Sequence, residues 1–185
     1  MAKYNVSMVI GSLRKESYNR KLAGALAALA PTHVAFTELR IDDLPLFNQD
    51  QETNMPEPAA RMKREIEAAH GVLFVTPEYN RSIPGVLKNA VDWASRPYGK
   101  SAWKGKPAAI AGASTGSIGT AAAQSHLRSI LTILEMPVMG QPELYLKFSD
   151  NLIDAQHQVT DVAARKLMVS FVDRFAAWVE KHGAG

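Results

Sequence analysis

The 185-residue chain contains no cysteine, which excludes disulfides, thiolate nucleophiles and thiol-ligated metal sites. The same absence fits a reducing compartment, so we expect a cytoplasmic protein. The N-terminal segment Met1-Ala-Lys-Tyr-Asn-Val lacks a long apolar stretch, and no signal peptide is expected. No apolar run reaches the ~20 residues of a transmembrane helix, so we expect no membrane partner.

Clustered basic residues are also missing, although the formal net charge is +3. Lysines and arginines alternate with carboxylates, as in residues 14–16 and 61–65, a pattern typical of solvated helix faces. We therefore do not expect nucleic acid as a partner. The histidines never occur at metal-binding spacing, so no metal site is expected and they are interpreted as caps and surface residues: His33, His70, His126, His157 and His182.

Short apolar segments alternate with helical periodicities along the whole chain. The patterns predict strands at 4–10, 34–39, 71–76, 107–113 and, more weakly, 138–146, and helices at 19–30, 59–70, 84–95, 118–134 and 155–181. Right-handed crossovers between parallel strands favour a three-layer α/β/α sandwich. Since no linker or repeat interrupts the pattern, we expect residues 1–185 to form one domain.

The segment after the first predicted strand is rich in hydrogen-bond donors. Residues 11–19 supply the hydroxyls of Ser12 and Ser17, the guanidinium of Arg14 and the amide of Asn19. Free N–H groups and the dipole at a helix N-terminus favour anions, and several donors suit a phosphate monoester. Ser17 alone could be an ordinary N-cap, but the combination predicts a phosphate site.

Two later loops follow buried strands and are also unusual in composition. Residues 76–85 contain two prolines, the flat ring of Tyr79 and the Asn80 amide, which suit a planar heterocycle but also a stiff surface connection. Residues 112–119 are small and serve either as a ligand wall or as plain turn chemistry. Because ligands of doubly wound sheets bind beyond the carboxyl ends of the strands, we expect the three loops to meet.

With these loops in view, the sequence resembles the NADPH-dependent FMN reductase family, in the branch of the soluble quinone and chromate reductases. The resemblance is densest at residues 11–19 and 77–93, beginning Gly11-Ser12-Leu13-Arg14 and Pro77-Glu78-Tyr79-Asn80. It implies a flavodoxin-like fold with strand order 2-1-3-4-5. It also implies these FMN contacts: Ser12, Arg14, Ser17, Asn19 and the Tyr18 backbone N–H at the phosphate; Pro77, Glu78, Tyr79 and Asn80 along the ring and ribityl chain; and Ser114, Thr115 and Gly116 on the other side.

The resemblance implies an FMN-dependent oxidoreductase that takes hydride from NADPH or NADH. Electrons would pass by ping-pong transfer to a small acceptor such as a quinone, chromate or free flavin. Since hydride chemistry belongs to the cofactor, no obligatory catalytic acid or base is expected. Backbone N–H groups of residues 80–82 would stabilise the anionic edge of the reduced flavin.

Arg81 and Ser82 are assigned to the substrate side of the site. Many members of the family carry an aromatic residue at position 81, whereas this chain has Arg81. Its positive charge would attract the 2′-phosphate of NADPH or an anionic acceptor; the alternative is a solvated arginine.

Proteins that resemble this chain form dimers or tetramers, which implies self-association here. Residues 44–47, Leu44-Pro45-Leu46-Phe47, lie in a long loop, where such an apolar cluster would otherwise face solvent. We predict that this segment lies at a subunit interface.

Two other functions are compatible with parts of the sequence. A flavodoxin-type carrier would bind FMN without turnover of its own, but carriers usually present an acidic docking face and this chain is net basic. A serine hydrolase could use Ser114, which lies in a G-x-S-x-G match. Only one weak strand follows Ser114, and His157 and His182 fall in the last predicted helix, so the hydrolase is disfavoured.

Overall fold

The structure, a computed structural model, describes residues 3–183. Met1 and Ala2, which begin the segment for which no signal peptide is expected, lie outside the described residues. The described chain contains a parallel sheet in the order β2-β1-β3-β4-β5. Its strands are β1 (Tyr4–Ile10), β2 (Val34–Glu38), β3 (Gly71–Val75), β4 (Ala108–Ser114) and β5 (Leu144–Lys147). The predicted strand order is therefore confirmed.

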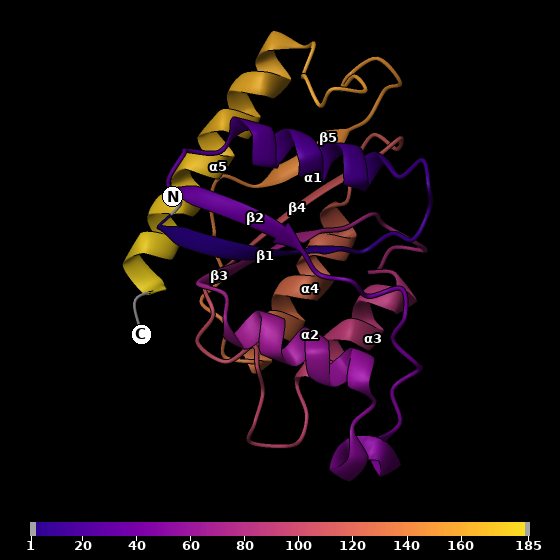
Figure 1. Ribbon diagram of the computed structural model, residues 1–185. Helices are drawn as coiled ribbons and strands as arrows, with labels where there is room; N and C mark the ends of the chain where they lie inside the picture. The colour runs from indigo at the N-terminus through magenta and orange to yellow at the C-terminus, as the bar shows by residue number, and fades with distance from the viewer. Residues whose placement is uncertain (1–2, 184–185) are drawn as a thin grey trace.

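Helices cover both faces of this sheet (Figure 1). One face carries α1 (Tyr18–Leu29) and α5 (Val162–His182); the other carries α2 (Glu57–Glu67), α3 (Gly85–Ala94) and α4 (Ala121–Ile133). A short 3₁₀ helix, Gln49–Asn54, precedes α2. This is the expected α/β/α sandwich of flavodoxin-like type.

Burial along the strands follows from their positions in the sheet. Every residue of β3 is buried, because helices pack on both of its faces. The edge strand β2 is buried only at Val34 and is exposed at Thr37 and Glu38. Leu22 and Leu26 of α1 pack with α5 residues such as Phe171 in one core, while Leu87 and Trp93 of α3 belong to the other.

Two predicted boundaries differ from the structure by more than three residues. The last strand begins at Leu144, and Val138 forms only an isolated bridge with Ala108. The last helix begins at Val162, because the Asp161 carboxylate accepts the Ala164 N–H and caps it there. Before it, Asp154 accepts backbone N–H groups of Gln156 and Gln158 and folds the segment as a loop.

The register of the central strands brings their following loops together. Ile10 pairs with Val75, and Val75 pairs with Ala111. The Gly11 N–H donates to the Val75 carbonyl and the Thr76 N–H to the Ala111 carbonyl. Residues from three distant parts of the sequence therefore leave the sheet side by side.

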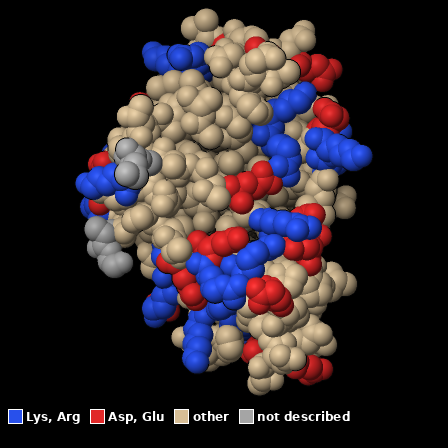
Figure 2. All heavy atoms as spheres, in the orientation of Figure 1, with Lys and Arg blue, Asp and Glu red and all other residues tan. Residues whose placement is uncertain are grey.

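Acidic and basic side chains intermingle over the face drawn in Figure 2. This arrangement agrees with their alternation in the sequence. Between residues 3 and 183, no helix is both long and apolar enough to cross a membrane.

Candidate functional site

The loops after β1, β3 and β4 line one small cavity of about 150 Å³. Its walls contain all the proposed FMN contacts except Asn80 and Gly116, and add Ala113. The lining residues are Ser12, Arg14, Ser17, Tyr18, Asn19, Pro77, Glu78, Tyr79, Ala113, Ser114 and Thr115. The predicted meeting of the three loops is thus present in the structure.

The start of α1 presents donors that the protein itself leaves free. Ser17 is the N-cap and accepts the Arg20 N–H at 3.3 Å, while Ser12 accepts the Arg14 N–H at 3.4 Å. Both hydroxyls act as acceptors in these bonds, so their protons stay available to a ligand. Within residues 3–183, the backbone N–H groups of Tyr18 and Asn19 have no acceptor.

The Arg14 side chain is exposed and contributes to the cavity wall. Among the described residues its guanidinium makes no hydrogen bond and no ion pair; it lies over the Tyr18 ring, 5.5 Å from the centroid. A guanidinium with free donors can bind two oxygens of a phosphate at once.

Asn19, a predicted phosphate contact, lines the cavity and is also bonded within the fold. Its amide donates to the Ala113 carbonyl and accepts the Ala113 N–H, both at 2.9 Å. The residue is 2% exposed, so these two bonds join the start of α1 to the end of β4. The side chain thus shapes the cavity wall, and among the described residues the Asn19 backbone N–H has no acceptor.

Tyr79 and Ser82 exchange two backbone hydrogen bonds of 3.0 Å and enclose a tight turn. Its central residues, Asn80 and Arg81, have positive φ angles of 51° and 65°, as in a type I′ turn. Asparagine tolerates this conformation, but arginine is strained in it. Of the backbone N–H groups of residues 80–82, which were predicted to face the flavin edge, that of Ser82 is used in the turn. Those of Asn80 and Arg81 have no acceptor in the described chain.

This turn is fastened to α4 at both ends. Glu78 Oε2 accepts the Ala123 N–H at 3.1 Å and so caps the helix. Ser82 Oγ lies 3.1 Å from His126 Nδ1. No sequence pattern indicated the contact with His126, since 44 residues separate the two positions.

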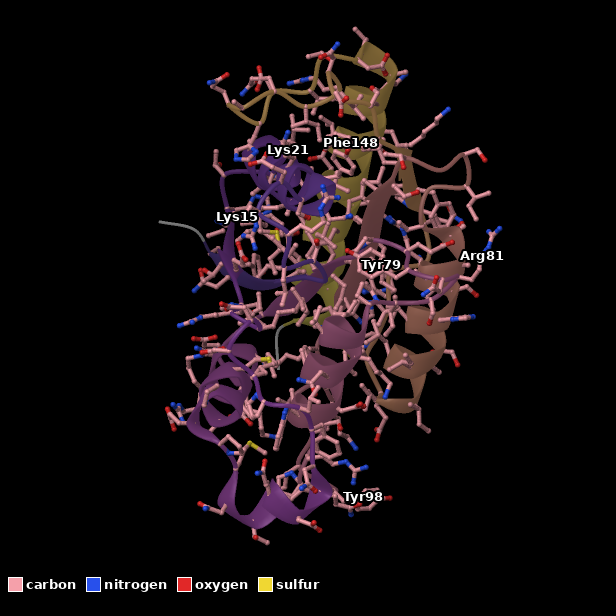
Figure 3. All side chains as sticks on the ribbon, turned by 90° about the vertical axis from the view of Figure 1, so that its right-hand side faces the viewer. Lys15, Lys21, Tyr79, Arg81, Tyr98 and Phe148 are labelled. Carbon is pink, nitrogen blue, oxygen red and sulfur yellow. The ribbon has the colours of Figure 1, made fainter. Side chains whose placement is uncertain are left out.

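Arg81 and Ser82, the proposed substrate contacts, lie outside the cavity wall. Arg81 is 75% exposed at its side chain, and its Nη1 lies 3.9 Å from Glu78 Oε1. Figure 3 looks onto this edge of the molecule and shows Arg81 further out than Tyr79. Arg81 is therefore an exposed positive charge in the turn beside Tyr79.

The hydroxyl of Ser114 is engaged in its own turn. It donates to the Gly119 carbonyl at 2.6 Å and accepts the Gly116 N–H at 3.2 Å. No described histidine is bonded to it, so the pairing that a serine nucleophile requires is missing. The small residue Gly112 is needed by the fold, because a Cβ there would collide with Thr120 and with the Thr76 carbonyl.

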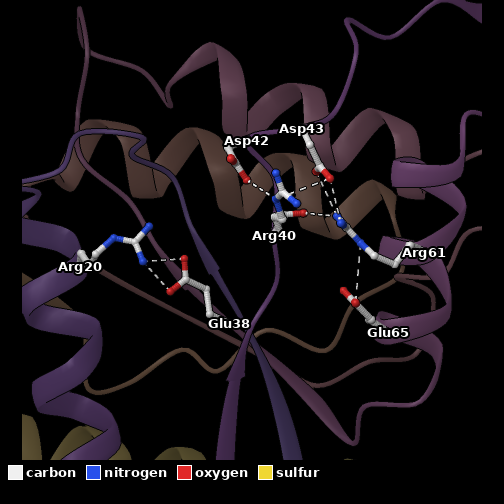
Figure 4. A network of polar contacts seen from close by, with 7 residues as sticks. All are labelled: Arg20, Glu38, Arg40, Asp42, Asp43, Arg61 and Glu65. Carbon is white, nitrogen blue, oxygen red and sulfur yellow. Dashed lines mark hydrogen bonds and ion pairs between the residues drawn. The ribbon is translucent and has the colours of Figure 1, made fainter.

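A second cavity of about 310 Å³ opens at the same edge, beside β2. Its charged side chains are paired: Arg20 with Glu38, and Arg40 with Asp42 (Figure 4). The network continues through Asp43 and Arg61 to Glu65. Hydrogen bonds from Arg40 lower the pKa of Asp42, and those from Arg61 lower the pKa of Asp43.

A larger cavity, of about 590 Å³, lies between the ends of α3 and α4 and is lined by Tyr98 and Ile133. It shares no residue with the loops after β1, β3 and β4. Cavity size therefore does not identify the candidate site; the concentration of free donors does.

The donor set at the 150 Å³ cavity fits the phosphate end of FMN. Two hydroxyls, a guanidinium and two free backbone N–H groups surround a helix N-terminus, while the exposed Tyr79 ring offers a surface for a planar ring system. Between residues 3 and 183, no group of three or more histidine or carboxylate side chains could hold a metal.

Comparison with known proteins identifies the family. Residues 4–151 match the sequence profile of the family described as NADPH-dependent FMN reductase. A 2-hydroxy-1,4-benzoquinone reductase of a Burkholderia species is 52% identical over 174 residues, covering 94% of this chain and 95% of the relative. A quinone reductase of Pseudomonas putida is 50% identical over 182 residues, covering 98% and 97%.

The same relationship is found among solved structures. FerB, a flavoenzyme NAD(P)H:(acceptor) oxidoreductase from Paracoccus denitrificans, superposes with a TM-score of 0.93 at 46% identity, covering 97% of this chain and 98% of that one. An NADH:FMN oxidoreductase structure at 19% identity has a TM-score of 0.68, a likeness of fold.

Proposed function

Because the chain belongs to the NADPH-dependent FMN reductase family, we propose that it is an FMN-dependent enzyme that reduces quinones with NAD(P)H. The family membership confirms the expected oxidoreductase class, the FMN cofactor and the pyridine-nucleotide donor. The identity of the electron acceptor, a quinone, is the part of the proposal that goes beyond family membership. Two relatives that match almost the whole chain are named as quinone reductases, one of them for a hydroxyquinone.

The observation that carries the proposal is the cluster of free donors at the start of α1. In a folded protein, buried or clustered polar groups normally find partners within the chain. Within the described part of the chain, Arg14, the two hydroxyl protons and the Tyr18 N–H remain free beside the Tyr79 turn. A ligand with a phosphate ester and a planar ring would fit both features: the phosphate would bind the free donors, and the ring would lie beside the Tyr79 turn.

The residues of the chain bind and orient, while bound FMN supplies the hydride and electron chemistry. Ser12, Ser17 and Arg14 would hold the phosphate. The turn around Tyr79, fixed to α4 through Glu78, would set the position of the ring. Arg81 would attract the 2′-phosphate of NADPH or an anionic quinone to the open side.

The test begins with an absorbance spectrum of the purified protein, followed by anaerobic addition of NADPH and then of a benzoquinone. We expect flavin bands near ~450 and ~370 nm that bleach with NADPH and return with the quinone, since the cofactor carries the redox step. A flavin that NADPH does not bleach would instead indicate an electron carrier. A protein that binds no FMN would contradict the proposal.

We also propose self-association as a dimer or tetramer, with Leu46 in the interface. The apolar segment 44–47 is only partly free: Phe47 packs edge-on against Trp93, and Leu44 packs on the same core. Leu46 is 85% exposed and is the side chain that a partner would cover. Size-exclusion chromatography of Leu46→Asp should show a smaller species than the parent; an unchanged elution volume would exclude this interface.

A cytoplasmic location remains part of the proposal. It is supported by the cysteine-free sequence, which fits a reducing compartment. Fractionation of the source cells with an antibody to the protein would test it, and enrichment in the secreted fraction would contradict it.

A further inference from the structure

The Tyr18 side chain contacts both an aromatic ring and a charged group. The Phe148 ring is stacked with the Tyr18 ring, with centroids 4.4 Å apart and planes at 25°. The Arg14 guanidinium carbon lies over the Tyr18 ring, 5.5 Å from its centroid. This distance is within the range of cation–π attraction, so the aromatic stack also contacts Arg14.

The base of this stack is fixed. Phe148 is 3% exposed, and its N–H donates to the Ser114 carbonyl at 2.8 Å. It follows directly after β5 and packs in the core that α1 and α5 share; Figure 3 shows it in the part of the molecule where these two helices lie. Tyr18 is in turn the first residue of α1.

Arg14, which the Tyr18 ring contacts, has few other contacts to orient its side chain. Its side chain is exposed, and among residues 3–183 it has no carboxylate or carbonyl partner. A free arginine loses much side-chain entropy when it is immobilised on a ligand. A contact that limits its rotamers beforehand reduces this loss and so strengthens binding.

We propose that the Tyr18 side chain is a positioning residue that orients Arg14 toward the FMN phosphate. This inference rests on the proposed function, in which the 150 Å³ cavity holds that phosphate. It assigns to the Tyr18 ring a role separate from that of its backbone N–H. The selectivity for a phosphorylated flavin then depends on the aromatic stack as well as on the donors.

The test compares FMN with riboflavin, which lacks the phosphate, in fluorescence titrations of the full-length apoprotein. Tyr18→Leu should weaken FMN binding about two- to fivefold, the loss of an exposed cation–π contact, and leave riboflavin binding unchanged. Tyr18→Phe keeps the ring and should bind FMN like the parent. Tyr18→Met keeps a flexible contact for Phe148 without a ring face for Arg14, and should behave as Tyr18→Leu; it replaces that variant if the leucine protein does not fold.

A double-mutant cycle makes the inference specific to Arg14. In an Arg14→Ala background, Tyr18→Leu should have no further effect on FMN affinity. Equal weakening of FMN and riboflavin, additive effects of the two substitutions, or unchanged FMN affinity in Tyr18→Leu would each overturn the inference while leaving the proposed function intact. A parent protein that binds no FMN would overturn both.

Discussion

Two cavities open at the carboxyl edge of the same sheet, and they differ in whether their arginine side chains are paired with carboxylates. In the larger one, beside β2, Arg20 and Arg40 are bonded to Glu38 and Asp42. In the smaller one, at the start of α1, Arg14 has no partner among the described residues. In the larger cavity the arginine donors are thus satisfied within the protein, while the smaller cavity has donors that are free to bind a ligand.

The difference shows that a binding site is identified by what the fold leaves unpaired. Salt bridges at the β2 edge fix the path of the chain after the strand (Figure 4). An anion that entered there would have to displace carboxylates from arginines. At the start of α1 an anion would displace only water, because the helix end offers free N–H groups.

The substitution Asn19→Ala should have the largest effect on stability. Asn19 lines the smaller cavity, but its side chain is hydrogen-bonded within the protein, as the charged side chains of the larger cavity are. Asn19→Ala leaves the N–H and carbonyl of Ala113 without partners in a buried place. The free energy of unfolding of the apoprotein should fall by about 2–4 kcal/mol. Urea denaturation followed by circular dichroism measures it. A loss of FMN affinity with full apoprotein stability would show that the amide serves the ligand instead.

Arg14→Ala removes a donor that, unlike the Asn19 amide, makes no hydrogen bond within the described residues. FMN affinity should fall about ten- to a hundredfold, as for loss of a charge-assisted hydrogen bond, while apoprotein stability stays within about 0.5 kcal/mol of the parent. The matched control is Arg20→Ala, which removes a paired arginine from the other cavity and should leave FMN affinity unchanged. Equal losses in the two variants would remove the distinction between the cavities.

Arg81→Gly examines the strained turn that belongs to the smaller cavity. Glycine adopts positive φ without strain, so the apoprotein should be stabilised by about 1 kcal/mol. Thermal unfolding measures this gain, and Asn80→Gly is the control with a smaller expected gain, since asparagine tolerates positive φ. A destabilised glycine variant would show that the arginine makes a contact that offsets its strain. Unchanged NADPH/NADH preference and anionic-acceptor kinetics would support the solvated alternative for Arg81.

Asp43→Asn tests the paired network and should have the smallest effect. The hydrogen bonds from Arg61 lower the pKa of Asp43 below 3.8, so its stabilising contribution is present above that pH and is lost as the pH falls through the lowered pKa. The variant should be less stable by up to about 1 kcal/mol near neutral pH. Denaturation curves from pH 7 to pH 2 should show this difference shrinking in acid. A difference that persists at pH 2 would mean that the carboxylate charge is not responsible.

The helices and strands could be predicted where the sequence pattern is local. The buried run at 71–75 is recognised from neighbouring residues, whereas the helical pattern starts the last helix seven residues too early, at residue 155 instead of Val162. The hydrogen bonds of Asp154 compete with the helix there. The pattern predicts the last strand only weakly, at 138–146, because the extent of the short β5 depends on its pairing with β4.

The sequence alone determined the α/β order, the family resemblance and the three loops that meet, because periodicity and loop composition are properties of short segments. Only the tertiary structure decided which donors are free. The Asn19 amide is bonded to Ala113, and the Ser82 hydroxyl lies against His126, through contacts between residues far apart in the chain. Whether a polar group binds a ligand or holds the fold depends on what packs beside it, and parallel strands bring such neighbours together from distant parts of the sequence.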